Sequence, residues 1–263
     1  MKHILFVLSI PLFFFGCAAT SQEAMQKDDL KTVGTPIVTM EVSYFEGNDR
    51  VRGYLARPDD NKKHPGLILI HEWWGLNENM RENARRFAEL GYVALAVDMY
   101  NGEATKTAAQ ARVLATRVRK NMGGAFDNLN QAVRYLKGRD YVAADRLASV
   151  GWCFGGGWSY QMARNNLGVK ASVIYYGRFN PMDDLQKMRA TIMGHFGEND
   201  RGIKVDTVRE FQAVLKTLNG DHEVYIYPNA GHAFANEGGS RYNKDAADLA
   251  WKRTNRFLAE SLR

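Results

Sequence analysis

A cysteine set between glycines is the first feature of this chain that could do chemistry. In "SVGWCFGG" (149–156), Cys153 follows an apolar run and precedes a helix-like segment. The spacing matches the strand-to-helix elbow G-x-S-x-G, with cysteine where serine usually stands. The glycines let neighbouring backbone approach closely, and the amino end of a helix favours a thiolate. The alternative is a glycine-rich helix start with a buried structural cysteine, whereas a phosphate loop would require a lysine that "GWCFGGGWS" lacks.

A cysteine nucleophile needs a base, and the chain offers six histidines. His232, in "YPNAGHAFAN", lies in a loop directly after a strand and late in the chain, where the elbow's chain order places its base. His71 ends a strand and stays possible, while His195 inside the apolar "TIMGHFG" is better explained as a core or wall residue. The others lie in the leading segment, in a polar loop and at a strand start: His3, His64 and His222.

The base in turn needs an orienting acid, which should fall between the cysteine and His232 and after a strand. Asp200, in the polar loop "GENDRG", meets both conditions, although it could also be an ordinary loop residue capping the next helix. Glu198 and Asp183 are weaker candidates. Cys153, Asp200 and His232 thus occur in the required order, each at the end of an expected strand.

The loop "LIHEWWGLN" (69–77) can complete such a site. An elbow enzyme needs a second backbone amide to stabilise an oxyanion, so we expect the amides of Trp73 and Phe154 to form that pair. Trp74 and Trp73 either pack ordinarily or line an apolar pocket, which we favour. Glu72 begins an H-E pair, but Gly75 stands where a zinc-binding H-E-x-x-H needs its second histidine, so no metal site is expected.

Strand-like and helix-like segments alternate from residue 36 onward, which predicts one α/β domain with a mostly parallel sheet covered by helices on both faces. Two strands at the start, separated by a turn, should pair antiparallel. The strands are expected at 37–45, 51–58, 66–71, 92–98, 146–151, 170–177, 190–197 and 222–228, and the helices at 77–91, 104–121, 124–138, 155–166, 204–219 and 245–262.

Composition narrows the class of protein. The 263 residues are 45 % hydrophobic and 24 % charged, as in an ordinary globular domain. The net charge of +6 is not concentrated as in a nucleic-acid binder. The densest basic stretch, "ARVLATRVRK" (111–120), reads as the solvated face of an amphipathic helix. No nucleic-acid partner is therefore expected.

The first 35 residues are predicted not to belong to the fold. Residues 1–17 have a basic start, an apolar stretch and a final Gly-Cys, which indicates a secretory signal that resembles a lipoprotein signal, although Phe14 replaces its usual leucine. Cys17 would then be lipidated, residues 18–35 would be a flexible tether and residues 36–263 the folded domain. We expect an extracytoplasmic, periplasmic lipoprotein held to the membrane by that anchor; the alternative is a plain cleaved signal. A thiol-redox role is disfavoured because the chain has no C-x-x-C.

The motifs "HEWWG", "GWCFGG", "GENDRG" and "YPNAGHAFAN", in this order and at these spacings, resemble the dienelactone hydrolase family over residues 37–263. The resemblance implies an α/β-hydrolase fold and a triad of Cys153, Asp200 and His232, with no cofactor. It also implies that Glu72 holds the resting thiol until substrate displaces it. The reaction expected is hydrolysis of a carboxylic ester or lactone through a thioester.

The sequence departs from that family where substrate is bound. Members that act on dienelactone hold its carboxylate with arginines, one of them four residues after the catalytic histidine, and that position is Asn236 here. Arg112 is near the expected helix of the other arginine but cannot be matched to it. Asn236 is therefore predicted to line the pocket of a monomer. Its substrate is expected to be a small ester or lactone that need not be dienelactone. The rival hypothesis is an inactive lipoprotein that uses the same pocket to bind an apolar ligand.

Overall fold

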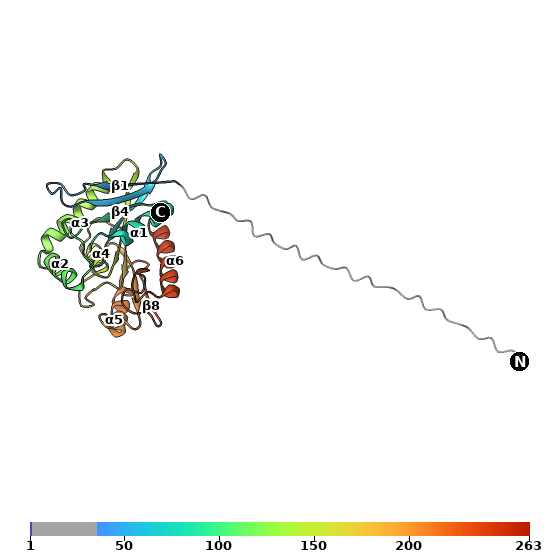
Figure 1. Ribbon diagram of the computed structural model, residues 1–263. Coiled ribbons are helices and arrows are strands. Elements are labelled where there is room, and N and C mark those ends of the chain that lie inside the picture. The colour runs from blue at the N-terminus through green and yellow to red at the C-terminus, as the bar shows by residue number, and fades with distance from the viewer. Residues whose placement is uncertain (2–35) are drawn as a thin grey trace. The chain divides into compact units, whose positions relative to one another are not determined.

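The computed structural model describes Met1 and residues 36–263, and Figure 1 shows the folded domain. The predictions for the signal segment, for Cys17 and for the tether fall outside the described residues. Within the domain a single sheet of eight strands has the order β1-β2-β4-β3-β5-β6-β7-β8. No helix among the described residues is long and apolar enough to cross a bilayer.

The sheet is antiparallel only at one edge. β1 pairs with β2 and β2 with β4 in antiparallel register, and every later pairing is parallel. β4 and the second half of β3 are continuous apolar runs, as expected for strands buried on both faces. The strands are β1 (Ile37–Val42), β2 (Gly53–Pro58), β3 (His64–Ile70), β4 (Val93–Val97), β5 (Val142–Trp152), β6 (Ala171–Tyr175), β7 (Thr191–Gly197) and β8 (Glu223–Tyr227).

Helices cover both faces of this sheet. α1 and α6 pack their apolar residues into the core on one face, and α2, α3, α4 and α5 form the core on the other. Successive residues of each strand point alternately into these two cores. The helices are α1 (Glu78–Glu89), α2 (Ala108–Lys120), α3 (Met122–Lys137), α4 (Phe154–Arg164), α5 (Val205–Leu215) and α6 (Lys244–Ser261). The predicted α/β architecture is confirmed.

Among the strands, the largest difference from the expected boundaries is at β5. It was expected from Arg146 but begins at Val142, because Val142 pairs with His64 before the register shifts between Pro65 and Gly66. The residues inside this irregularity, Ala144, Asp145 and Arg146, are exposed or half-buried, so their sequence carries no strand periodicity.

The parallel pairing determines where polar side chains can meet. β3, β5, β7 and β8 run in the same direction, so their carboxyl ends share one edge of the sheet. The segments that follow these four ends contain Glu72, Cys153, Asp200 and His232. That edge is where ligands of open α/β sheets bind.

Candidate active site

The turn from β5 to α4 is strained at the cysteine. Cys153 has φ 53° and ψ −110°, a backbone conformation that residues other than glycine rarely adopt. Its amide donates a hydrogen bond to the Tyr175 carbonyl at 2.9 Å. Its flanking glycines are required by space. A Cβ on Gly151 would lie 2.0 Å from the Gly155 carbonyl oxygen, and a Cβ on Gly155 would lie 2.0 Å from that of Ile70. This tight contact between α4 and the ends of two strands holds the thiol at the sheet edge.

The histidine and the aspartate expected from the sequence lie in line with this thiol. His232 Nε2 is 3.1 Å from Cys153 Sγ, and His232 Nδ1 is 2.7 Å from Asp200 Oδ2. The other Asp200 oxygen accepts the amides of Gly202 and Ile203 at 2.7 and 3.1 Å. Asp200 therefore stabilises its own loop, as an ordinary loop aspartate would, and also holds the imidazole.

Two loops must approach closely for this contact to form. The backbone amides of Glu198 and Asn199 donate to carbonyls of the β8 end, at Tyr227 (3.0 Å) and Ala230 (2.8 Å). Gly197 permits the approach, since a Cβ there would lie 2.4 Å from the Ala230 oxygen. The segment that carries the acid is thereby bonded directly to the segment that carries the histidine.

The charges around the imidazole favour its protonated form. Burial lowers the pKa of His232, but hydrogen bonds to Asp200 and Cys153, together with their negative charges, raise it to about 10. Burial alone would raise the pKa of Asp200. The hydrogen bond and positive charge of His232, together with the hydrogen bonds from two loop amides, bring this pKa below its ordinary value. An imidazolium beside the sulfur stabilises negative charge on the sulfur.

Glu72 lies in the same site but is bonded to a different partner. Its Oε2 accepts the side-chain amide of Asn236 at 2.6 Å, while the hydrogen bond of Cys153 goes to His232. The buried Oε1 of Glu72 and the buried hydroxyl of the adjacent Tyr176 make no hydrogen bond among the described residues. Burial raises the pKa of Glu72. The side chains of Asn236 and Tyr176 and the positive charges of His232 and Arg241 act in the opposite direction and offset part of this rise.

Tyr176 was not singled out from the sequence, yet it forms part of this site. It is fully buried, its ring centre lies 5.3 Å from that of His232, and its φ of 38° is strained. We included it in the strand expected at 170–177, but β6 ends at Tyr175. A polar residue at the carboxyl end of a parallel strand was the signal that could have identified it.

The reactive groups open onto a cavity of about 980 Å³. Its lining includes aromatic side chains, with the ring centres of Trp73 and Trp74 4.9 Å apart. Five exposed arginines also line it, and none of them makes a salt bridge among the described residues: Arg112, Arg119, Arg178, Arg201 and Arg241. Two of them belong to the basic stretch interpreted as a solvated helix face, so that face is also part of the cavity mouth.

The other titratable residues considered from the sequence are bonded elsewhere. His71 and His195 are fully buried, and neither ring is hydrogen-bonded to Cys153. Glu198 accepts a bond from a loop amide and Asp183 from a tyrosine hydroxyl. The described residues contain no group of three or more His, Cys, Asp or Glu side chains suited to a metal ion.

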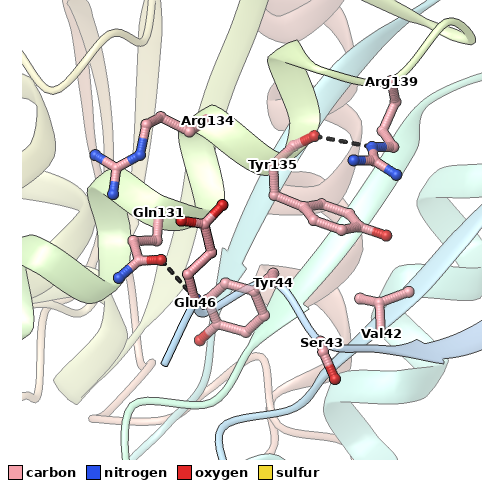
Figure 2. A pocket seen from close by; sticks show the side chains of 8 residues that line it. All are labelled: Val42, Ser43, Tyr44, Glu46, Gln131, Arg134, Tyr135 and Arg139. Atoms are coloured by element: carbon pink, nitrogen blue, oxygen red, sulfur yellow. Dashed lines mark hydrogen bonds between the residues drawn. The ribbon is translucent and has the colours of Figure 1, made fainter. Parts of the chain in front are cut away.

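A second cavity of about 430 Å³ lies between the segment after β1 and α3. Figure 2 shows the side chains around it, with Gln131 bonded to the amide of Glu46 and Arg139 bonded to the carbonyl of Tyr135. It is lined by no cysteine or histidine. The nucleophile and its base belong to the larger cavity alone.

The chain is similar to known proteins over most of the folded domain. Residues 51–262 match the family model described as "Dienelactone hydrolase family". A "Putative carboxymethylenebutenolidase" of Saccharolobus solfataricus is 30% identical, with 83% of this chain and 97% of that protein covered. "Protein usf" of Aquifex pyrophilus is 33% identical, with 83% and 97% covered. The crystal structure of a "Putative Dienelactone Hydrolase" from Klebsiella pneumoniae has a TM-score of 0.74 at 25% identity, with 86% and 99% covered.

Proposed function

The chain belongs to the dienelactone hydrolase family, and from that premise we propose that it cleaves a carboxylic ester or lactone through a thioester on Cys153. Its homologues make it a lactone or ester hydrolase. The observation that carries the covalent route is the hydrogen-bonded line from Cys153 through His232 to Asp200, at 3.1 and 2.7 Å. A nucleophile, a base and an orienting acid in contact are the parts that such a reaction needs.

Acylation begins when the sulfur of Cys153, its proton held by His232, attacks the substrate carbonyl carbon. A carbon–sulfur bond forms, and the carbonyl oxygen becomes an oxyanion. When this intermediate collapses, the carbon–oxygen bond of the ester breaks, and the imidazolium of His232 gives its proton to the leaving alkoxide. Asp200 keeps the imidazole oriented and stabilises its positive charge.

Backbone amides supply the stabilisation of the oxyanion. Phe154 is the first residue of α4, and no described residue accepts a hydrogen bond from its amide or from that of Trp73. Both residues line the cavity beside the thiol. Free amides aimed at the developing charge are what an oxyanion hole provides, and losing one such donor typically costs about 100-fold to 1000-fold in turnover.

Water then completes the cycle. It attacks the thioester carbonyl while His232 takes its proton, and the carbon–sulfur bond breaks to release the carboxylic acid. The sulfur recovers the proton from His232, so the enzyme returns to its starting state with one ester bond cleaved and one water consumed.

The cavity further supports a substrate with negative charge beside its reacting carbonyl. Its two acidic residues are occupied, since Asp200 bonds His232 and Glu72 bonds Asn236. The five arginines around the mouth have no ionic partner among the described residues, so an anion would find uncompensated positive charge there. The tryptophan wall would contact the apolar part of the same molecule.

A panel of activated esters and lactones, each in a neutral and a carboxylate-bearing form, tests this function on the purified protein. Cys153→Ala should lower kcat/KM by about 1000-fold or more on the best substrate while the Tm stays near the wild-type value. Iodoacetamide should inactivate the wild type with the label on Cys153. If Cys153→Ala keeps wild-type kcat/KM, the covalent route is wrong and a binding module for an apolar ligand becomes the better explanation.

The same panel tests the preference for charge. Arg178→Gln and Arg201→Gln should each raise KM for carboxylate-bearing substrates and leave KM for the neutral ones nearly unchanged. Arg134→Gln is the matched control, because that exposed arginine lines the other cavity. Equal effects on neutral and anionic substrates would contradict the role proposed for the arginines.

The start of the sequence supports a location outside the cytoplasm. The basic residues, the apolar stretch and the Gly16-Cys17 pair resemble a lipoprotein signal, so we propose a periplasmic enzyme with Cys17 lipidated. In its native host the protein should fractionate with membranes, and mass spectrometry should find an acylated Cys17. A soluble mature protein that starts at another residue would refute the anchor.

A further inference from the structure

His71 stands between β3 and Glu72, and both of its ring nitrogens are bonded to backbone. Nδ1 is 2.5 Å from the carbonyl oxygen of Glu72, and Nε2 is 3.2 Å from the amide nitrogen of Met99. An amide can only donate and a carbonyl can only accept, so Nε2 must be bare and Nδ1 must carry the proton. The ring is fully buried, and burial lowers its pKa to about 4, which keeps it neutral.

This bond determines the direction of the next peptide group. The Glu72 carbonyl also accepts the amide of Gly75 at 3.3 Å, so it is held from two sides. In a trans peptide unit the C=O of one residue and the N–H of the next point in opposite directions. Holding the Glu72 carbonyl against His71 therefore turns the Trp73 amide away from His71.

The same ring also contacts the residue that carries the other free amide. The imidazole stacks on Phe154, with ring centres 5.6 Å apart and an angle of 14° between the planes. Tyr100 packs edge-on against the imidazole, with ring centres 4.6 Å apart, so the imidazole packs against both aromatic rings. His71 is thus in contact with the backbone before Trp73 and with the side chain of Phe154.

We propose that His71 is a positioning residue that sets the two oxyanion amides, those of Trp73 and Phe154, at their working separation. The proposal rests on the proposed function, because it assumes that an oxyanion forms at these amides. His71 does not touch the substrate. It acts through the Glu72–Trp73 peptide on one side and through the Phe154 ring on the other.

His71→Phe tests this role, since phenylalanine keeps a flat ring against Phe154 but has no donor for the Glu72 carbonyl. We expect kcat for an activated ester to fall about tenfold to 100-fold with little change in KM. A misaligned amide stabilises the oxyanion of the transition state less, whereas substrate binding in the ground state depends little on it. The rate of alkylation of Cys153 by iodoacetamide should stay within about twofold of wild type, since that displacement develops no oxyanion. His71→Gln, whose side-chain amide offers an N–H group as donor and a carbonyl oxygen as acceptor, should recover most of the lost kcat.

His195→Phe is the matched control, because His195 is the other fully buried histidine and neither of its hydrogen bonds reaches the oxyanion loop. It should lower the Tm as His71→Phe does, without the selective loss of kcat. The proposal is overturned if His71→Phe keeps wild-type kcat, or if its alkylation and ester turnover fall together. If Cys153→Ala retains activity, the proposed function fails instead, so the two failures are distinguishable.

A measurement on the wild type keeps the proposal testable even if His71→Phe does not fold. Nitrogen-15 NMR of labelled histidine should show the His71 ring neutral near pH 7, with its proton on Nδ1 and protected from exchange. A ring protonated on Nε2 would leave the Glu72 carbonyl without its donor and would refute the proposal.

Discussion

The proton shared by Cys153 and His232 responds to every charge around it. Asp200 and the sulfur itself draw it toward the imidazole, which is why the pKa of His232 rises to about 10. Glu72 is the remaining acidic group of the cavity, and its partner Asn236 is a neutral amide. An ionised Glu72 would add a negative charge near the sulfur and oppose the thiolate.

Glu72→Gln tests whether that carboxylate restrains the thiol. The variant removes the charge and keeps the shape and the hydrogen bond from Asn236. We expect iodoacetamide to react about threefold to tenfold faster near neutral pH, with the rate profile displaced to lower pH, because one repulsive charge is gone. Alkylation rates measured from pH 5 to 9 give the comparison.

Glu237→Gln is the control for that experiment, since Glu237 is exposed and pairs with Arg86 at 3.4 Å instead of facing the thiol. Its profile should match wild type. An unchanged profile in Glu72→Gln, with the Tm preserved, would mean that Glu72 only braces its loop.

At the scale of secondary structure, the site depends on how closely α4 packs against the ends of β3, β5 and β6. Gly151, Gly155 and Gly156 face backbone atoms at distances that no side chain could occupy. The first amides of α4 lack a side-chain cap at Cys153, so they remain available to the cavity. The same packing therefore determines both the strain at Cys153 and the free helix amides.

Gly155→Ala should break this packing, because its Cβ would lie 2.0 Å from the Ile70 carbonyl oxygen and 2.6 Å from that of His71. Backbone cannot yield as a flexible side chain does, so we expect a loss of more than about 3 kcal/mol in the free energy of unfolding. Urea unfolding followed by circular dichroism measures it.

Gly123→Ala is the matched comparison in another helix. Gly123 lies in the first turn of α3, and a Cβ there would meet nothing within 4 Å. The change should stabilise the protein by about 0.5 to 1 kcal/mol through helix propensity. If both variants changed the free energy of unfolding by a similar amount, α4 would not depend on its close packing against the strand ends.

For the molecule as a whole, buried histidines couple stability to pH. His71 and His195 are fully buried, and burial lowers the pKa of the first to about 4 and of the second to about 3. The unfolded chain binds a proton at each site below about pH 6.5, whereas the folded chain does not. Their contribution to stability is therefore complete above pH 6.5, falls as the solution becomes more acidic, and levels off only below the folded pKa.

Replacing His195 by phenylalanine should flatten this dependence. Each such histidine lowers the free energy of unfolding by about 2 kcal/mol between pH 7 and pH 5. Each pH unit over which the unfolded chain binds one proton more than the folded chain corresponds to about 1.4 kcal/mol. The free energy of unfolding of His195→Phe should accordingly fall less over this range than that of wild type. Parallel losses in the two proteins would mean that His195 is protonated in the folded state.

The local pattern of the sequence was enough to determine the class of fold and the order of its elements. Continuous apolar runs and helical spacing report burial within one segment, so the strands and helices were found with small errors at their ends. The glycines around Cys153 can be read in the local sequence, although the Ile70 carbonyl that requires Gly155 comes from a distant strand. Chain order, together with a position in a loop after a strand, then singled out Asp200 and His232.

Contacts between distant segments were decided only by the tertiary structure. β2 lies beside β4, and β5 shifts its register against β3, neither of which a strand's own residues encode. The bond from Asn236 to Glu72 joins residues 164 positions apart, and the arginines of the cavity mouth come from several separate segments. Such groups meet because parallel strands bring their carboxyl ends to one edge and glycines let the backbones touch, and both depend on the packed sheet.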